Sequence, residues 1–285
     1  MKVIKTLYAQ EVHMGDIPLR QPIPTVNTQQ VDPFLLLHHH VHEVQAGSNH
    51  LSSGVGPHPH RGFSPVTFIY QGGVHHRDSR GNSSVVKEGG VQWMDAGLGI
   101  VHSERPPAQL CENGGVQEIV QIWVNLPSHL KMKEPVYIPL QRLDMPAMPG
   151  HEKVYHVSGN VGSSSQGPLQ SAYPMNSFFG ELQPNSPLAF EVFEGDAACL
   201  YLLSGTGKLS GHGLVEEHNL YVLAPGKYQL ESDTKMKLLY MSAKPIEEKV
   251  ETYGPFVMNN QTEILEAMRD YQMGKMGVLI EHELD

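Results

Sequence analysis

Residues 66–97, VTFIYQGGVHHRDSRGNSSVVKEGGVQWMDAG, contain short β-branched and aromatic runs separated by Gly, Asn and Asp. Such runs predict β-strands joined by tight turns. A similar stretch, LYLLSGTGKLSGHGLVEEHNLYVLAPG, occupies residues 200–226. A pair of glycines brackets two predicted strands in each stretch, 25 positions apart at Gly72–Gly97 and 21 apart at Gly205–Gly226. This repeat indicates an internal duplication into two β-barrels.

The flanking sequence extends this all-β pattern. Pro, Gly and Ser crowd together between residues 145 and 170, so we predict an N-terminal domain over residues 1–145 and a C-terminal domain over residues 146–285. One helix is expected at residues 260–273, where Asn260 can cap a run of apolar residues at helical spacing. We expect this helix to pack back on the N-terminal domain.

Composition narrows the class of protein. The 285 residues carry a net charge of −10, which disfavours direct binding to nucleic acid. Cys111 and Cys199 are too few and too far apart for a disulfide framework, so a reducing, cytoplasmic location is expected. No run approaches the roughly 18 apolar residues of a membrane span. The unusual quantity is the 17 histidines.

Two short motifs place histidines at metal-binding spacing. In GPHPHRG (56–62), His58 and His60 would lie on one face of a strand, about 6–7 Å apart along the chain. In GIVHSE (99–104), His102 and Glu104 have the same spacing. If the two strands are neighbours, three imidazoles and one carboxylate converge and leave open positions on a six-coordinate ion. The alternative is ordinary polarity on a strand surface, which the second His/Glu pair makes weaker.

The second repeat offers an internal control. Counting from its glycines, the positions that match the four candidate ligands are Glu191, Phe193, Glu231 and Asp233. None of the four is histidine. We therefore predict one metal site, in the N-terminal barrel, and a metal-free C-terminal barrel.

Other histidines are given structural roles. In the cluster His38–His42, a strand would place His39 on the face opposite the even-numbered histidines. No carboxylate accompanies the cluster at matching spacing, which favours structural polarity or a place at a pocket rim over metal binding. His75 and His76 precede a turn and are interpreted as strand and turn residues.

The histidine motifs also carry a family resemblance, which extends from about Asp32 to Gly277. The motifs are PHPHRGF (57–63), HRDSRGN (76–82), VQWMDAG (91–97), GIVHSE (99–104) and YGPFVMN (253–259). They resemble the pirin family of bicupins. The resemblance implies a cupin barrel, or double-stranded β-helix, in each half, and Fe(II) in the N-terminal one. Its metal ligands would be His58, His60, His102 and Glu104.

One position departs from the family pattern. Ser64-Pro65 follows Phe63 where many pirins have an acidic residue, a difference that concerns the shape of the pocket more than the metal. The residues alone leave Mn, Co, Ni and Cu open as alternatives to Fe(II). No organic cofactor is expected.

The implied activity is that of a quercetin 2,3-dioxygenase. Its substrates would be O₂ and a flavonol or related enediol, with Glu104 as the catalytic residue that binds the metal and accepts a substrate proton. The alternative is an iron- and redox-dependent regulatory protein that acts through a protein partner without turnover. A metal-free structural cupin is the third interpretation.

Overall fold

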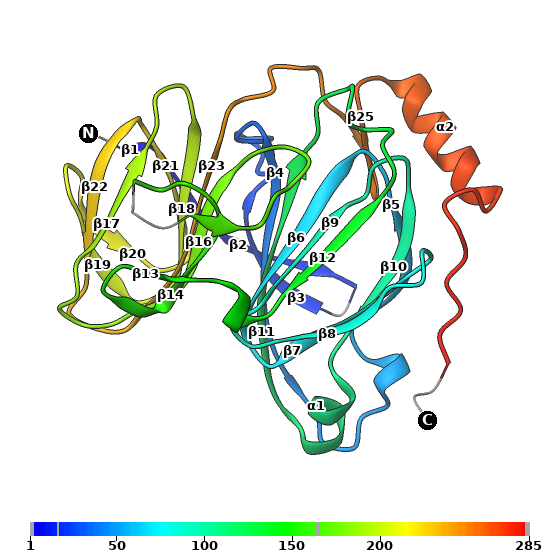
Figure 1. Ribbon diagram of the computed structural model, residues 1–285, viewed down its shortest axis with the longest axis horizontal. Helices are drawn as coiled ribbons and strands as arrows, with labels where there is room; N and C mark the ends of the chain where they lie inside the picture. The colour runs from blue at the N-terminus through cyan, green and yellow to red at the C-terminus, as the bar shows by residue number, and fades with distance from the viewer. Residues whose placement is uncertain (1–2, 16, 163–165, 283–285) are drawn as a thin grey trace. The chain divides into compact units, whose positions relative to one another are not determined.

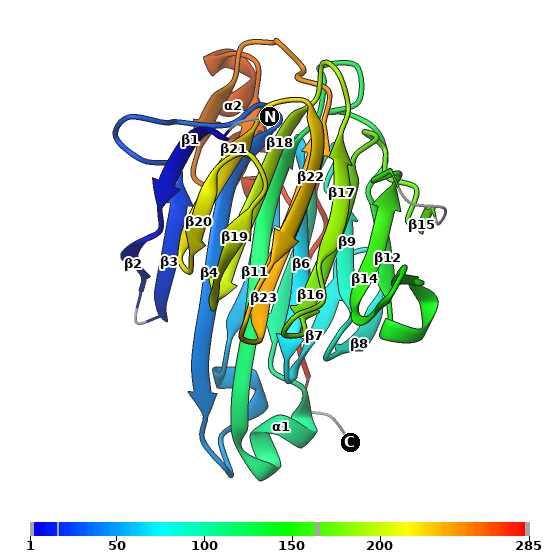
Figure 2. The same cartoon turned by 90° about the vertical axis from the view of Figure 1, so that its left-hand side faces the viewer.

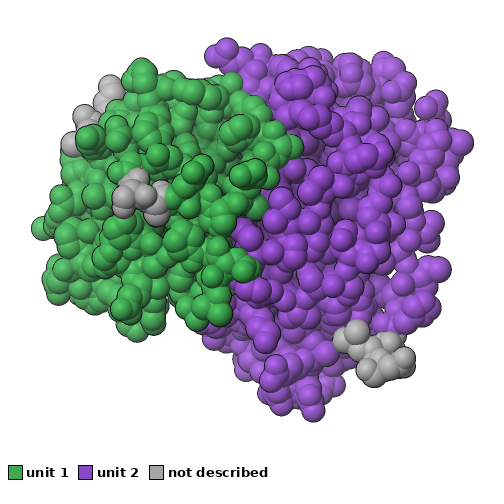
Figure 3. Space-filling model, viewed as in Figure 1, with its two compact units in different colours: residues 1–39, 142–245 green, residues 40–141, 246–285 purple. Residues whose placement is uncertain are grey.

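The computed structural model describes residues 3–15, 17–162 and 166–282, and the chain divides into two compact units (Figure 3). Unit 1 comprises residues 1–39 and 142–245, and unit 2 comprises residues 40–141 and 246–285. A domain boundary at residue 145 stays a prediction, because each unit takes in two separate stretches of chain. Among the described residues, no helix combines the length and the apolar character of a membrane-spanning helix.

Unit 2 is built from antiparallel sheets, as the alternation of short apolar runs and turns predicts (Figure 1). One sheet contains the neighbouring strands β12 (Val136–Leu140), β9 (Val91–Asp95), β6 (Phe63–Gln71) and β11 (Gly115–Asn125). A smaller sheet has the order β5 (Val55–His60), β10 (Ile100–Arg105), β7 (Gly73–Asp78) and β8 (Ser83–Lys87). The remaining elements are η1 (His50–Ser52), α1 (Ala108–Asn113), β24 (Glu251–Tyr253) and β25 (Phe256–Met258).

The predicted C-terminal helix is confirmed as α2 (Gln261–Gln272), which belongs to unit 2 (Figure 1). Asn260 caps it, because its side chain accepts a hydrogen bond from the backbone N–H of Glu263 at 3.0 Å. Ile264 and Ala267 are buried against Val101 of β10. The helix thus covers the face of β10 opposite to that of His102, since neighbouring residues of a strand point to opposite faces.

Unit 1 repeats this strand order in its own two sheets (Figure 2). Its larger sheet has the order β1 (Val3–Tyr8), β21 (Asn219–Leu223), β18 (Ala197–Ser204), β23 (Met236–Ala243), β16 (Asn176–Leu182), β14 (His151–Gly159) and β13 (Ala147–Met148), with β15 (Gly167–Pro168) paired to β14. Its smaller sheet has the order β17 (Leu188–Val192), β22 (Gly226–Glu231), β19 (Thr206–Leu209) and β20 (Gly213–Glu216). The strands β2 (Gln10–Met14) and β3 (Ile17–Ile23) form an antiparallel pair, and β4 (Phe34–Val44) continues from unit 1 into unit 2.

The smaller sheets show how the strands of the two units correspond. His58 of β5 faces His102 of β10, and in the corresponding strands Phe190 of β17 faces Tyr228 of β22. Of the four positions counted from the glycines, Phe193 and Asp233 lie beyond the ends of β17 and β22, whereas His60 and Glu104 lie within β5 and β10, so the count does not follow the strands. The count failed because the turns that join the strands differ in length between the two units.

Candidate metal centre

Strand β5 places two imidazoles on one face, as its His-x-His spacing predicts. The Nε2 atoms of His58 and His60 lie 3.1 Å apart, and the two rings are nearly perpendicular, at 86°. The Nδ1 atom of His58 lies 2.8 Å from the carbonyl oxygen of Gly56, and that of His60 lies 3.4 Å from the carbonyl oxygen of Pro255. Because a carbonyl oxygen only accepts hydrogen bonds, each Nδ1 carries the proton and each Nε2 of the neutral ring has a free lone pair.

Strand β10 brings a third imidazole to the same place. In the antiparallel register His102 pairs with His58, and its ring centroid lies 4.3 Å from that of His58 and 4.9 Å from that of His60. One nitrogen of each ring lies within 4.8 Å of the others. The Nε2 atom of His102 is buried and has no hydrogen-bond partner among the described residues.

Burial keeps two of these imidazoles neutral. His60 and His102 are 3% and 1% exposed. Burial, reinforced by the neighbouring imidazoles, holds the pKa of each well below its ordinary value. The neutral ring is the form of histidine that binds metal ions.

Glu104 lies two residues beyond His102 on the same face of β10, and a row of polar side chains holds its carboxylate. Its Oε1 accepts hydrogen bonds from Thr67 Oγ1 at 3.1 Å and from the Gln92 amide, and its Oε2 accepts one from the Gln121 amide at 2.8 Å. Thr67 pairs in register with both glutamines, so the three donors form one rung across β9, β6 and β11. We call Thr67, Gln92 and Gln121 the donor rung.

The three imidazoles fit a divalent transition metal. Two nitrogens bound at right angles to one ion, each about 2.1 Å from it, are about 3.0 Å apart, close to the 3.1 Å between the His58 and His60 Nε2 atoms. The buried, unpartnered Nε2 of His102 supplies the third donor. Glu104 is outside this cluster of nitrogens and stays a predicted ligand.

Two family models match the chain, Pirin over residues 16–124 and the Pirin C-terminal cupin domain over residues 179–277. The chain belongs to the pirin family. Both the predicted resemblance and the predicted tandem cupin fold are thereby confirmed.

Other pirins and a solved structure match nearly the whole chain. Pirin-1 of Arabidopsis thaliana is 34% identical over 283 residues, which cover 96% of this chain and 94% of that protein. A pirin-like protein of Solanum lycopersicum is 35% identical over 283 residues, which cover 96% and 92%. The crystal structure of a quercetin 2,3-dioxygenase from Acinetobacter baumannii has a TM-score of 0.88 at 32% identity, and the match covers 98% of this chain and 99% of that one.

The histidine cluster of β4 in this pirin has other partners. His38 Nε2 lies 2.7 Å from Gln21 Oε1, and burial lowers the pKa of His38 to about 4. His39 Nδ1 lies 3.1 Å from the Tyr201 hydroxyl, whereas His40 and His42 contact one another. Among the described residues, only the three imidazoles at β5 and β10 form a group of three or more potential ligands.

Sequence reasoning missed the side chains that support the centre. The donor rung carried no recognised motif, because its three residues come together only through strand pairing. His76, interpreted as a strand residue, lies with its Nδ1 atom 3.4 Å from that of His102, and its Nε2 atom lies 2.9 Å from Asp78. The His-x-Asp spacing of this pair matches that of His102 and Glu104 and was the available signal.

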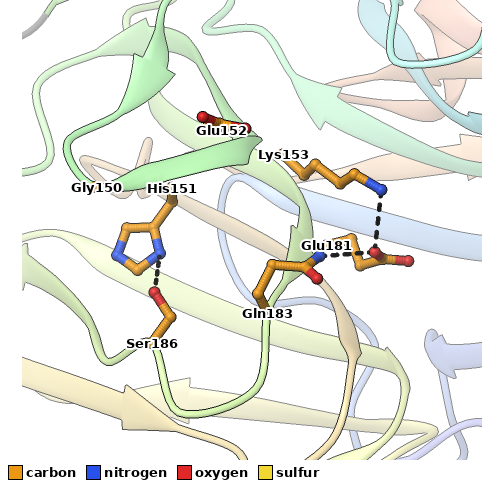
Figure 4. A pocket seen from close by; sticks show the side chains of 7 residues that line it. All are labelled: Gly150, His151, Glu152, Lys153, Glu181, Gln183 and Ser186. Carbon is orange, nitrogen blue, oxygen red and sulfur yellow. Dashed lines mark hydrogen bonds and ion pairs between the residues drawn. The ribbon is translucent and has the colours of Figure 1, made fainter.

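A pocket of about 350 Å³ in unit 1 contains none of the predicted site residues (Figure 4). Most of its polar groups are paired with one another: Glu181 accepts from Gln183 at 2.8 Å and lies 3.6 Å from Lys153, and His151 lies 3.2 Å from Ser186. Its lining residues are Gly150, His151, Glu152, Lys153, Glu181, Gln183 and Ser186. Because these groups satisfy each other, we assign this pocket no chemistry.

Proposed function

We propose that this pirin-family protein is a metal-dependent dioxygenase that acts on a flavonol or a related enediol with O₂. Fe(II) would be held by the three imidazoles of His58, His60 and His102, with the Glu104 carboxylate as the fourth ligand. The observation that carries the proposal is the convergence of these three rings, each with its Nδ1 backed by a neighbouring group. The similarity to a quercetin 2,3-dioxygenase over 98% of the chain supports the reaction class.

The surroundings of the centre favour a flat aromatic substrate. The Phe63 and Trp123 rings lie 4.3 Å apart, and each approaches the His60 imidazole, at 5.0 and 5.5 Å between centroids. Trp123 is half-buried, so part of its indole stays accessible. An aromatic wall beside the metal would align a planar ring system by stacking.

When bound, Fe(II) would offer open positions to the substrate oxygens and to O₂ and would pass electrons between them. Glu104 would accept the hydroxyl proton of the substrate. Its two oxygens are held by the donor rung, which keeps the carboxylate on the interior side of β10 beside the metal ligands. Thr67 and Gln92 occupy Oε1 and Gln121 occupies one position of Oε2, so the remaining lone pair of Oε2 would bind the metal and would accept the substrate proton only when the carboxylate loosens from it.

The direct test is anaerobic mixing of Fe(II)-loaded protein with quercetin, followed by O₂. We expect loss of the flavonol absorbance band together with consumption of O₂ in equal amounts. Protein loaded with Mn, Co, Ni or Cu serves as the comparison series. If all five forms bind metal and none turns over quercetin or another enediol, the dioxygenase proposal is wrong, and a regulatory role through a protein partner becomes the better interpretation.

A further inference from the structure

Next to His102, two further side chains of unit 2 form a hydrogen-bonded series. The Nδ1 atoms of His102 and His76 lie 3.4 Å apart, and His76 Nε2 lies 2.9 Å from Asp78 Oδ2. His76 and Asp78 alternate along β7, so they share one face, and Asp78 pairs in register with His102. All three side chains are buried, with exposures of 1%, 0% and 4% for His102, His76 and Asp78.

The partner of His102 differs in kind from those of the other two rings. His58 and His60 have backbone carbonyl oxygens behind Nδ1, and these oxygens hold the Nδ1 proton in place. His102 instead has another imidazole, whose Nδ1 can donate or accept depending on its tautomer. His76 alone therefore leaves undecided whether the Nε2 atom of His102 has a lone pair for a metal.

Asp78 removes this ambiguity, because donors surround its carboxylate. Oδ1 accepts from the backbone N–H groups of Arg80 at 2.9 Å and Asn82 at 3.1 Å, and Oδ2 accepts from the Asn82 side-chain amide at 2.8 Å. The remaining contact of Oδ2, with His76 Nε2, requires the proton to lie on that nitrogen. His76 Nδ1 is then unprotonated and accepts from His102 Nδ1–H, which leaves the lone pair of His102 on Nε2.

We propose that Asp78 and His76 are positioning residues that hold the proton of His102 on Nδ1 and thereby make its Nε2 atom a metal donor. This inference rests on the proposed metal site and names the residues that fix which nitrogen of His102 is protonated. The Tyr137 ring stacks on His76 at 3.8 Å and 6°, and the Tyr137 hydroxyl lies 2.8 Å from Ser84 Oγ. This stacking fixes the plane of His76, so that its two nitrogens stay aligned between Asp78 and His102.

The first test is the substitution Asp78→Asn. The amide oxygen would remain with the two backbone donors of the turn, so the amide N–H would face His76 and reverse the direction of the series. His102 would then carry its proton on Nε2. We expect Ni(II) and anaerobic Fe(II), each measured by competition with a chelator, to bind about 10–100-fold more weakly. A change of less than about threefold in a folded variant would overturn the proposal.

The second test determines which ring nitrogens of His102 and His76 carry a proton in the metal-free wild-type protein. Long-range ¹H–¹⁵N spectra of ¹⁵N-histidine-labelled protein distinguish protonated from unprotonated ring nitrogens. We expect His102 in the Nδ1–H tautomer and His76 in the Nε2–H tautomer, with the His102 tautomer changed in Asp78→Asn. Observation of Nε2–H on His102 in the wild type would overturn the proposal, and this measurement stands even if the variant fails to fold.

A neighbouring histidine provides the matched control. His75 lies on the opposite face of β7, where its Nε2 atom contacts Ser83 Oγ at 3.1 Å. We expect His75→Gln to leave metal affinity within about threefold of wild type. The two proposals fail in different ways: wild-type protein that binds no metal contradicts the proposed function, whereas metal binding that ignores both Asp78→Asn and His76→Phe contradicts only this inference.

Discussion

The two units share a strand order and differ in what they place between the sheets. In unit 2, His58 faces His102 across the β5–β10 pair, and both belong to the cluster of three imidazoles. In unit 1, the corresponding strands pair Phe190 with Tyr228, whose rings stack at 5.5 Å and 14°. Phe178 and Tyr240 extend this aromatic cluster within a continuous apolar core.

This difference shows that the cupin framework does not depend on the chemistry of its interior. Burial of Phe190 and Tyr228 contributes directly to folding, because apolar area leaves water. Buried imidazoles with unpartnered nitrogens oppose folding unless a ligand or a metal compensates for them. The apolar interior of unit 1 therefore stabilises the fold, whereas the imidazoles inside unit 2 lower its stability and provide a binding site.

The largest effect is expected from removal of the unit 2 imidazoles. The double substitution His58→Ala and His60→Ala should weaken Fe(II) and Ni(II) binding by about a thousandfold or more and abolish turnover, because two of the three nitrogen donors are lost. Metal content and chelator competition measure the result. The second His-x-His pair is the matched control: His40→Gln with His42→Gln should retain the metal. Equal loss in both variants would contradict the assignment of the centre.

The converse change in unit 1 should affect folding and not metal. Phe190→Ala removes a side chain that is 3% exposed and should lower the free energy of unfolding by about 3–5 kcal/mol, as measured by urea denaturation. Metal affinity should stay within about twofold of wild type. A folded Phe190→Ala protein that loses its metal would show that metal binding in unit 2 depends on side-chain packing in unit 1.

Unit 2 also contains a buried ammonium group whose effect depends on pH. Lys131 is 1% exposed, and its Nζ donates to the Gly62 and Val257 carbonyl oxygens and to Asn125 Oδ1, at 2.7, 3.1 and 2.6 Å. Burial lowers its pKa from 10.5 to about 8. Between these values the unfolded chain holds the proton that the folded protein has released, so stability should rise with pH by about 1.4 kcal/mol per unit.

Urea denaturation at pH 8 and 9.5 measures this slope. Lys131→Met should flatten it, whatever the substitution does to the overall stability. Lys153→Met, which alters an exposed lysine of unit 1, should leave the slope as in the wild type. If Lys131→Met has the wild-type slope, the folded and unfolded pKa values of Lys131 do not differ as expected.

The smallest effect is expected from the donor rung. Gln121→Leu removes the hydrogen bond to Glu104 Oε2, and we expect a fall of about tenfold in kcat/KM because the carboxylate is less well positioned. Unit 1 contains a matched pair, in which Gln183 donates to Glu181 at 2.8 Å. Gln183→Leu should leave kcat/KM unchanged. A greater loss of kcat/KM from Gln183→Leu than from Gln121→Leu would contradict the role given to the Glu104 carboxylate.

The fold and the three imidazoles could be predicted because their signals are local in sequence. The His-x-His of β5 and the His-x-Glu of β10 depend only on the two-residue period of a strand. The correspondence between the two repeats could not be predicted well, because it was counted through turns of unequal length. Register is set by backbone pairing, which places Phe190 opposite Tyr228 and Glu191 opposite Lys227.

By itself, the sequence determined an all-β chain of two tandem barrels with a C-terminal helix and the histidines that can meet a metal, because strand periodicity and capping act over a few residues. Only the tertiary structure decided which side chains support them. The donor rung joins residues as far apart as Thr67 and Gln121, and the proton of His102 depends on a carboxylate in another strand. Hydrogen bonds between strands have no period along the chain, so they become visible only when the barrel is closed.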